Sequence, residues 1–215
     1  DTGQVFSAFD TRLAGSVKGD DIKALAEKWF GSIESGEKYD RKLPVEPQQK
    51  QPRLLEVRED VPLDALYKTW HIDSRLEKGY YVADLISEVL GGGTSSRLYQ
   101  ALVKEKKLFS NIECYHFGSV EKGLFAIEGK LVKGVRMADA EAAVNEEVVK
   151  MQSEQINENE LQKVKNKTES VIAFEDMSVM TRVNNLAFYE LLGDAGLFNE
   201  DRERYFAVTR EDMLN

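Results

Sequence analysis

The chain has 215 residues, of which 42% are hydrophobic and 31% charged, and its formal net charge is -9 at pH 7. This composition is typical of a globular protein with enough apolar residues for one large core. The acidic balance argues against a general nucleic-acid-binding protein, because phosphate binding needs a concentrated basic face. No apolar run approaches the roughly 20 residues that a membrane-spanning helix needs.

The N-terminal part predicts a strand, a helix and a linker. Residues 11–17 are typical of a short strand, and apolar side chains then recur at helical spacing from Ile22 to Trp29. Residues 36–52 are polar and contain three of the four prolines, which indicates an extended linker. Because such a linker can bury little, we expect residues 1–35 to be the tail of a preceding domain and residues 53–215 to be the main domain.

The main domain alternates strand and helix patterns. Residues 53–59 and 62–72 are strand candidates, a helix is expected over 80–90, and another is expected after the glycine run. Residues 109–117 and 123–131 predict a β-hairpin, and the remainder is helical. The basic stretch 163–170 is interpreted as the solvated face of a helix. We therefore predict an α+β fold, an antiparallel β-sheet with helices packed on one face.

The run from Gly91 to Ser96 is interpreted as a structural corner. A phosphate loop would need a lysine followed by a serine or threonine after its second glycine, and here the first basic residue is Arg97. Gly91 is expected to end one helix, and Gly92 and Gly93 to allow a tight turn. Thr94 or Ser95 would cap the next helix. Structural roles are thus expected for Gly91, Gly92, Gly93, Ser95 and Ser96.

No catalytic or metal site is expected within the chain. Its two histidines, His71 and His116, lack any HxxEH or HxxE spacing, and convergence of both with Glu113 is disfavoured because strand histidines are commonly half-buried polar tips. Ser95, Ser96 and the lone Cys114 qualify as nucleophiles only by residue type. A self-contained serine or cysteine enzyme stays an open, weaker hypothesis.

Residues 91–131, GGGTSSRLYQALVKEKKLFSNIECYHFGSVEKGLFAIEGKL, resemble the second, non-catalytic domain of the pitrilysin/insulinase family of zinc peptidases, which includes the mitochondrial processing peptidases. Residues 13–33 are similar to the strand and helix that close the preceding domain of that family. The stretch from Ile156 to Ala195 resembles its C-terminal helices. The resemblance implies the half-domain fold of the processing peptidases, with residues 53–215 as an inactive peptidase-like domain.

The resemblance also implies a partner. In this family an HxxEH helix and a distant glutamate of the first half hold zinc, and two homologous halves close around an extended peptide. Since this chain has no HxxEH, zinc is expected only in a homologous catalytic half, joined in cis or supplied in trans, and the chain alone is expected to be inactive. Dimer formation is a further expectation, and a non-enzymatic scaffold or binding module is the alternative function.

The family's substrate-contacting pair is missing here. Many members place an arginine and, seven residues later, a tyrosine near the scissile bond, and these positions correspond to Val103 and Ser110. Neither side chain can replace the missing guanidinium or phenol. Arg97 and Tyr115 are therefore the candidate substrate-binding residues.

Overall fold

The computed structural model describes Ser16, residues 18–34, Gly36, Pro44 and residues 47–118, 120–175 and 177–214. The chain divides into an N-terminal unit, which ends at Asp60, and a C-terminal unit that begins at Val61. In the N-terminal unit, α1 (Gly19–Phe30) forms where a helix is predicted, and none of its residues is buried. The strand predicted over 11–17 lies outside the described residues, apart from Ser16.

The strand predicted over 53–59 is absent. These residues are described and carry no regular secondary structure. Leu54 and Leu55 are 92% and 84% exposed, so their apolar side chains find nothing to pack against. Half-buried packing, rather than an intrinsic backbone preference, is what usually holds a strand in place, and here it is missing.

Three strands form the antiparallel sheet of the C-terminal unit, in the order β1–β3–β2. Their bounds are Ala65–Ile72 for β1, Phe109–Phe117 for β2 and Gly123–Leu131 for β3. Both hairpin strands therefore have the predicted bounds. The register between β2 and β3 shifts between Phe109 and Asn111, which leaves Ser110 as the extra residue of a β-bulge.

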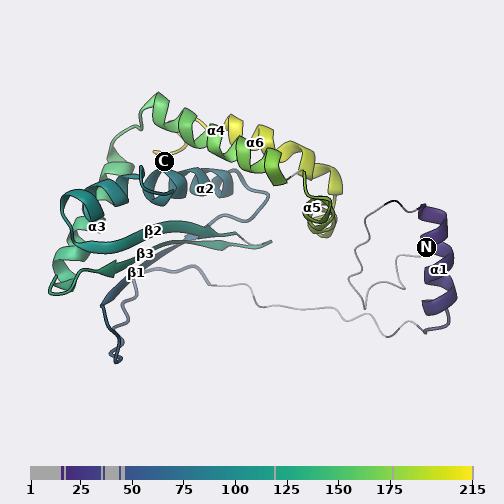
Figure 1. Ribbon diagram of the computed structural model, residues 1–215, viewed down its shortest axis with the longest axis horizontal. Helices are drawn as coiled ribbons and strands as arrows, with labels where there is room; N and C mark the ends of the chain where they lie inside the picture. The colour runs from purple at the N-terminus through teal and green to yellow at the C-terminus, as the bar shows by residue number, and fades with distance from the viewer. Residues whose placement is uncertain are drawn as a thin grey trace. The chain divides into compact units, whose positions relative to one another are not determined.

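Helices cover one face of this sheet in two layers. Figure 1 shows α2 (Lys78–Gly91) lying along the sheet, with α4 (Glu158–Glu175) and α6 (Asp201–Ala207) on the far side of α2. α3 (Met137–Ser153) contacts β1. The core lies between the layers, and its fully buried side chains come from strands and helices alike: Leu85, Leu98, Leu102, Ile127 and Val144. The α+β fold predicted from the sequence is confirmed.

The helix after the glycine run is wider than predicted. Residues 99–105 form a π-helix, η2 (Tyr99–Glu105), in place of regular α-helical turns. The amide of Lys106 donates to the carbonyl of Ala101, five residues back, and the amide of Leu108 to that of Leu102. The chain then enters β2 through Lys107, whose φ of 52° is the one positive value among the described non-glycine residues.

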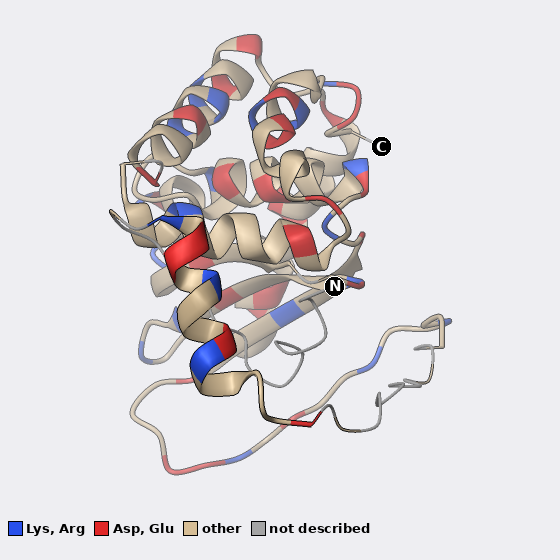
Figure 2. Ribbon diagram, turned by 90° about the vertical axis from the view of Figure 1, so that its right-hand side faces the viewer, with Lys and Arg blue, Asp and Glu red and all other residues tan. Residues whose placement is uncertain are grey.

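The basic stretch 163–170 is only partly solvated. Lys165 is 9% exposed, and its ammonium group donates to the carbonyls of Phe206 and Val208, at 2.8 and 2.6 Å. The prediction of an all-solvated face was wrong at this position, because the C-terminal end of α6 presents backbone carbonyls to Lys165 of α4. Elsewhere acidic and basic residues are interspersed along the helices, as Figure 2 shows. Of the described helices, none has the length and apolarity required to cross a bilayer.

Candidate functional site

The face of the sheet that points away from the helices, called the open face below, carries aromatic side chains around a carboxylate. Because side chains alternate along a strand, Tyr67 of β1, Glu128 of β3 and Tyr115 of β2 share this face. The Tyr67 and Tyr115 hydroxyls each donate to one oxygen of Glu128, both at 3.0 Å. The Phe117 ring meets that of Tyr115 edge-on, with centroids 5.1 Å apart.

The phenols of the open face are held as donors. The hydrogen bond to the Glu128 carboxylate raises the pKa of Tyr67, because the carboxylate favours the protonated phenol. Loss of hydration raises the pKa of Tyr115, and Glu128 raises it further. Since the Tyr115 hydroxyl is engaged with Glu128, the aromatic rings are what this surface offers to a ligand. Tyr67 and Phe117 are 61% and 60% exposed.

Arg97 lies elsewhere. Its guanidinium donates to both oxygens of Glu160 on α4, from Nε at 2.9 Å and from the terminal nitrogen at 2.6 Å. This pair raises the pKa of Arg97. α4 lies on the helical side of the sheet (Figure 1), whereas strand alternation places Tyr115 on the open face. The two candidate substrate-binding residues are therefore not brought together.

The positions of the missing family pair are also apart from any cluster of functional groups. Val103 lies on η2 and packs against the core. Ser110 lies in the β-bulge, and its hydroxyl donates to the carbonyl of Lys130 at 3.0 Å. Both side chains have structural contacts, and neither provides a charge or an aromatic ring.

The corner from Gly91 to Ser96 forms a turn, but the contacts of Gly91 and of the serine hydroxyls differ from those predicted. α2 ends at Gly91, and Gly93 has a φ of 94°, which suits a turn that disfavours side chains. A Cβ at Gly91, however, would lie 2.1 Å from the backbone nitrogen of Cys114, so this glycine lets α2 approach β2. The predicted cap at Thr94 or Ser95 is not formed: the Ser95 hydroxyl accepts from Lys163, and the Ser96 hydroxyl donates to the Gly93 carbonyl.

The described residues contain no group of three or more side chains suited to hold a metal ion. Strand alternation places His71 and Glu113 on the open face, while His116 points to the helical side, where its Nδ1 lies 3.1 Å from an oxygen of Asp84. The residues present therefore do not fit a zinc centre. Burial raises the pKa of the Cys114 thiol far above its ordinary value, which makes this thiol a poor nucleophile.

Sequence reasoning missed two clusters. One is the Tyr67–Glu128 half of the open face, which period-two alternation in 65–72 would have placed there. The other is a buried polar cluster in which Arg75 pairs with Asp201 at 2.5 Å, while Tyr81 donates to the second oxygen of Asp201 at 2.8 Å. Nothing in the sequence connects Arg75 with Asp201, because they are 126 positions apart.

Comparison with known proteins gives a consistent result. Residues 12–168 match the family model described as "Peptidase M16 inactive domain". A search of curated protein sequences found no match. Among solved structures, a protease from Helicobacter pylori is similar at 20% identity with a TM-score of 0.78, over 93% of this chain and 49% of that one. The chain thus spans about half the length of that protease.

Two further structures share the fold. The inactive peptidase domain from Bordetella parapertussis is 20% identical with a TM-score of 0.66, over 74% of this chain and 84% of that one. A chain of complex III2 from Candida albicans is 16% identical with a TM-score of 0.60, over 73% of this chain and 40% of that one. Since the family model covers most of the sequence and the fold agrees, the chain belongs to the peptidase M16 family, as an inactive domain of that family.

Proposed function

We propose that this chain is the non-catalytic half of a two-domain zinc peptidase, in which it forms one wall of the chamber and a surface that contacts the peptide substrate. An HxxEH-bearing half, joined in cis or in trans, would hold the zinc ion and carry out hydrolysis. The observation that carries the proposal is the open face, an aromatic surface that none of the described helices of the C-terminal unit covers.

The chemistry of the open face suits an extended peptide. The exposed rings of Tyr67 and Phe117 and the half-buried ring of Tyr115 can bury apolar side chains and exclude water, while Glu128 fixes the two phenols. Among the described strands β1 and β2 are the sheet edges, so either has backbone groups available for β-augmentation by a peptide. Arg97, which is already paired with Glu160, has a structural role in this arrangement.

The test compares variants of the chain joined to its HxxEH half, as the full-length protein. Tyr115→Ala is expected to raise KM about fivefold with kcat and zinc content unchanged, because ring contact area is lost. Tyr115→Phe should behave like the wild type, since its hydroxyl faces Glu128. Val149→Ala, at an exposed position of α3, is the matched control. Unchanged KM in Tyr115→Ala would contradict the substrate-contact role.

A non-enzymatic scaffold is the second candidate. It is favoured by the likeness to a chain of complex III2 from Candida albicans, a multisubunit assembly. The two hypotheses predict different behaviour of the full-length protein. If the chain is half of a peptidase, the full-length protein cleaves peptides in the presence of zinc. Stable incorporation into an assembly, with no cleavage by the joined protein, would instead support the scaffold.

A further inference from the structure

The helical side of the C-terminal unit contains a cleft that the proposed function does not use. It has a volume of about 480 Å³, within the range of small-ligand sites. Its walls come from α2, α4 and α5 (Val179–Leu191), and η3 (Ala195–Glu200) and α6 close it. α5, η3 and α6 lie beyond the residues that match the family model, which end at 168.

The side chains at the floor of the cleft are polar and form hydrogen bonds with one another. Arg75 donates to Asp201 and to the Tyr189 hydroxyl, and its guanidinium lies 4.5 Å from the centre of the Tyr80 ring. Asp84 accepts from the Tyr205 hydroxyl and lies beside His116. No buried side-chain nitrogen or oxygen of the described residues is without a partner. The floor is therefore a fixed surface, and a ligand is selected by the charge and shape around it.

The charge of the lining is negative. Four carboxylates and two cations line the cleft. The ion pairs Arg75–Asp201 and Lys167–Glu88 account for both cations and two carboxylates. Of the other two, Asp84 in the floor has His116 as its partner, and the exposed Glu175 at the C-terminal end of α4 has no ion pair with a lysine or arginine among the described residues. The excess favours a cationic ligand.

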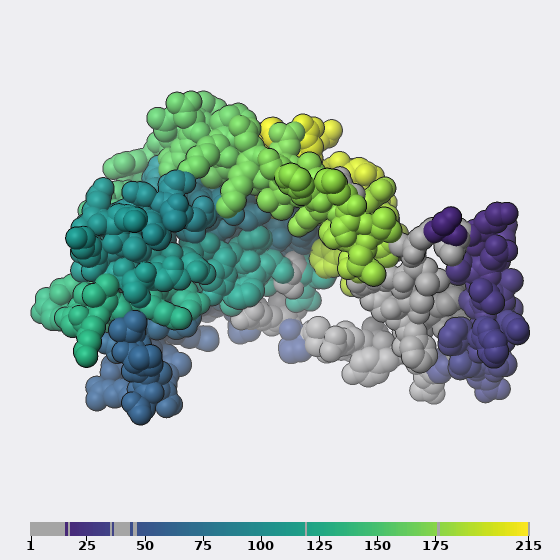
Figure 3. Space-filling view, in the orientation of Figure 1, coloured from purple at the N-terminus to yellow at the C-terminus, as the bar shows by residue number. Residues whose placement is uncertain are grey.

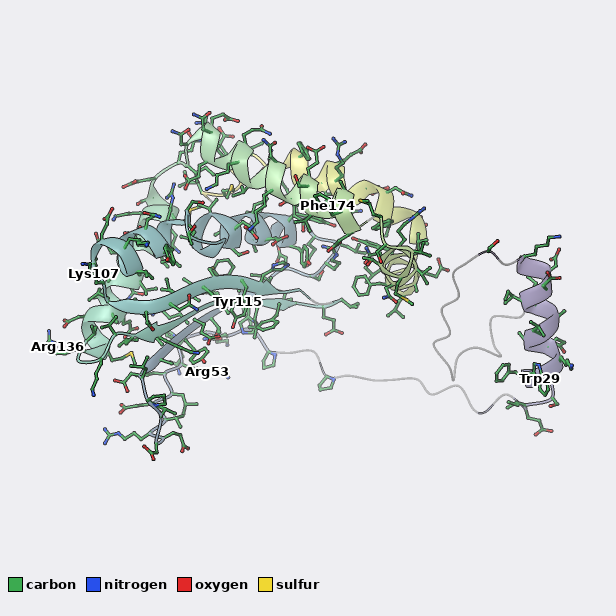
Figure 4. All side chains as sticks on the ribbon, in the orientation of Figure 1. Trp29, Arg53, Lys107, Tyr115, Arg136 and Phe174 are labelled. Atoms are coloured by element: carbon green, nitrogen blue, oxygen red, sulfur yellow. The ribbon has the colours of Figure 1, made fainter. Side chains whose placement is uncertain are left out.

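The walls of the cleft are apolar and aromatic. Val171 and Ile172 of α4 and Phe188 of α5 line it, and Phe198 of η3 adds a further ring. Aromatic faces attract cations, and the apolar walls can bury a hydrocarbon stem. At the C-terminal end of α4 and just beyond it, Phe174 and Met177 are 72% and 77% exposed. Figure 3 shows the surface of α4 running directly into that of α5, and Figure 4 labels Phe174 at this end of α4.

We propose that this cleft binds an ammonium or guanidinium group carried on an apolar stem. The stem lies between Val171, Ile172 and Phe188, and the cation lies near the carboxylates of Asp84 and Glu175. The group can belong to a small organic amine or to a lysine or arginine side chain within an apolar peptide segment. The site is separate from the open face, so it is independent of the chamber-wall proposal.

The test uses two pairs of probes on the isotopically labelled chain, followed by NMR. Butylguanidinium and its neutral analogue butylurea have the same shape, as do acetyl-Leu-Arg-Leu-amide and the same peptide with citrulline in place of arginine. We expect a charged probe to shift amides of α4 and α5 with a dissociation constant of about 1 mM, and its neutral analogue to bind at least fivefold more weakly. Binding by butylguanidinium identifies a small-amine site, whereas binding by the arginine peptide alone identifies a basic side chain as the ligand.

Variants make the assignment specific. Glu175→Gln is expected to weaken binding of the charged probe about threefold. The effect is modest because solvent screens the charge of this exposed side chain. Glu203→Gln makes the same change of charge on α6 at an exposed position outside the cleft, and should leave binding unchanged. Equal binding of charged and neutral probes, shifts that map away from the cleft, or absence of binding by both charged probes at about 10 mM would overturn the proposal. An unchanged affinity in Glu175→Gln would do so as well.

Discussion

Substitution of Gly91 by alanine is the sharpest test of how α2 sits on the sheet. A Cβ at this position would lie 2.1 Å from the backbone nitrogen of Cys114 and 2.4 Å from its Cβ, whereas ordinary van der Waals contact begins at 3.4 Å. A backbone atom in a paired strand cannot rotate away. α2 must therefore move off β2 by about 1 Å, a gap that forfeits a quarter to a half of the dispersion energy of each affected contact.

The affected contacts are those of the central core. α2 contributes Leu85, Val89 and Leu90, each no more than 3% exposed. Loosening this layer is expected to lower the free energy of unfolding by about 3 kcal/mol, at the upper end of the usual range for overpacking. In a unit of this size that loss corresponds to a fall in Tm of about 6–12 °C. Urea and thermal unfolding followed by far-UV circular dichroism measure both quantities.

Gly93→Ala is the matched control, because it tests backbone conformation without a clash. Gly93 has a φ of 94° and no atom within 4 Å of an added Cβ. Its substitution is expected to cost about 1–2 kcal/mol from the left-handed backbone alone. If Gly91→Ala costs no more than Gly93→Ala, the close approach of α2 to β2 is refuted, and the glycine run serves only as a turn.

Three other outcomes follow from individual contacts. Lys107→Gly should raise the free energy of unfolding by up to about 1 kcal/mol in urea titrations, because glycine adopts the positive φ of this position without steric strain. A loss of stability would contradict that backbone geometry. Arg75→Met should lower the free energy of unfolding by about 3 kcal/mol, because the buried Asp201 side chain loses its cationic partner. Arg75→Met with Asp201→Leu should recover part of the loss. Hydrogen bonds from the Lys78 ammonium, and then from the Thr209 amide, lower the pKa of Asp212 to about 2. The ionised Asp212 side chain therefore stabilises the fold fully above the unfolded pKa of about 3.9, and this stabilisation is lost as the pH falls through about 2. Asp212→Asn should therefore flatten the fall of the urea midpoint over that interval, and an unchanged pH profile would contradict the depressed pKa.

The sheet and its helical cover were predictable because they depend on local pattern. Residues 109–117 and 123–131 contain aromatic and β-branched residues and are separated by the short segment 118–122, and the structure reproduces both strands. The strand at 53–59 has a comparable pattern but no apolar partner, so the pattern alone was insufficient. The π-helical turns of η2 were not predicted, because apolar spacing predicts a helix but does not distinguish π-helical from α-helical turns.

The functional surfaces were harder to predict because they depend on which side of the sheet a residue faces. Arg97 and Tyr115 were grouped as substitutes for a missing pair, yet one is bound to α4 and the other lies on the open face. Strand alternation predicts the side on which Tyr115 lies: because Cys114 points into the core, Tyr115 must point away from it. The same rule applied to β1 places Tyr67 beside Glu128. The peptide-contacting role that we propose is therefore assigned to residues selected by strand register, and Arg97, which is paired with Glu160 on α4, is not expected to affect substrate affinity.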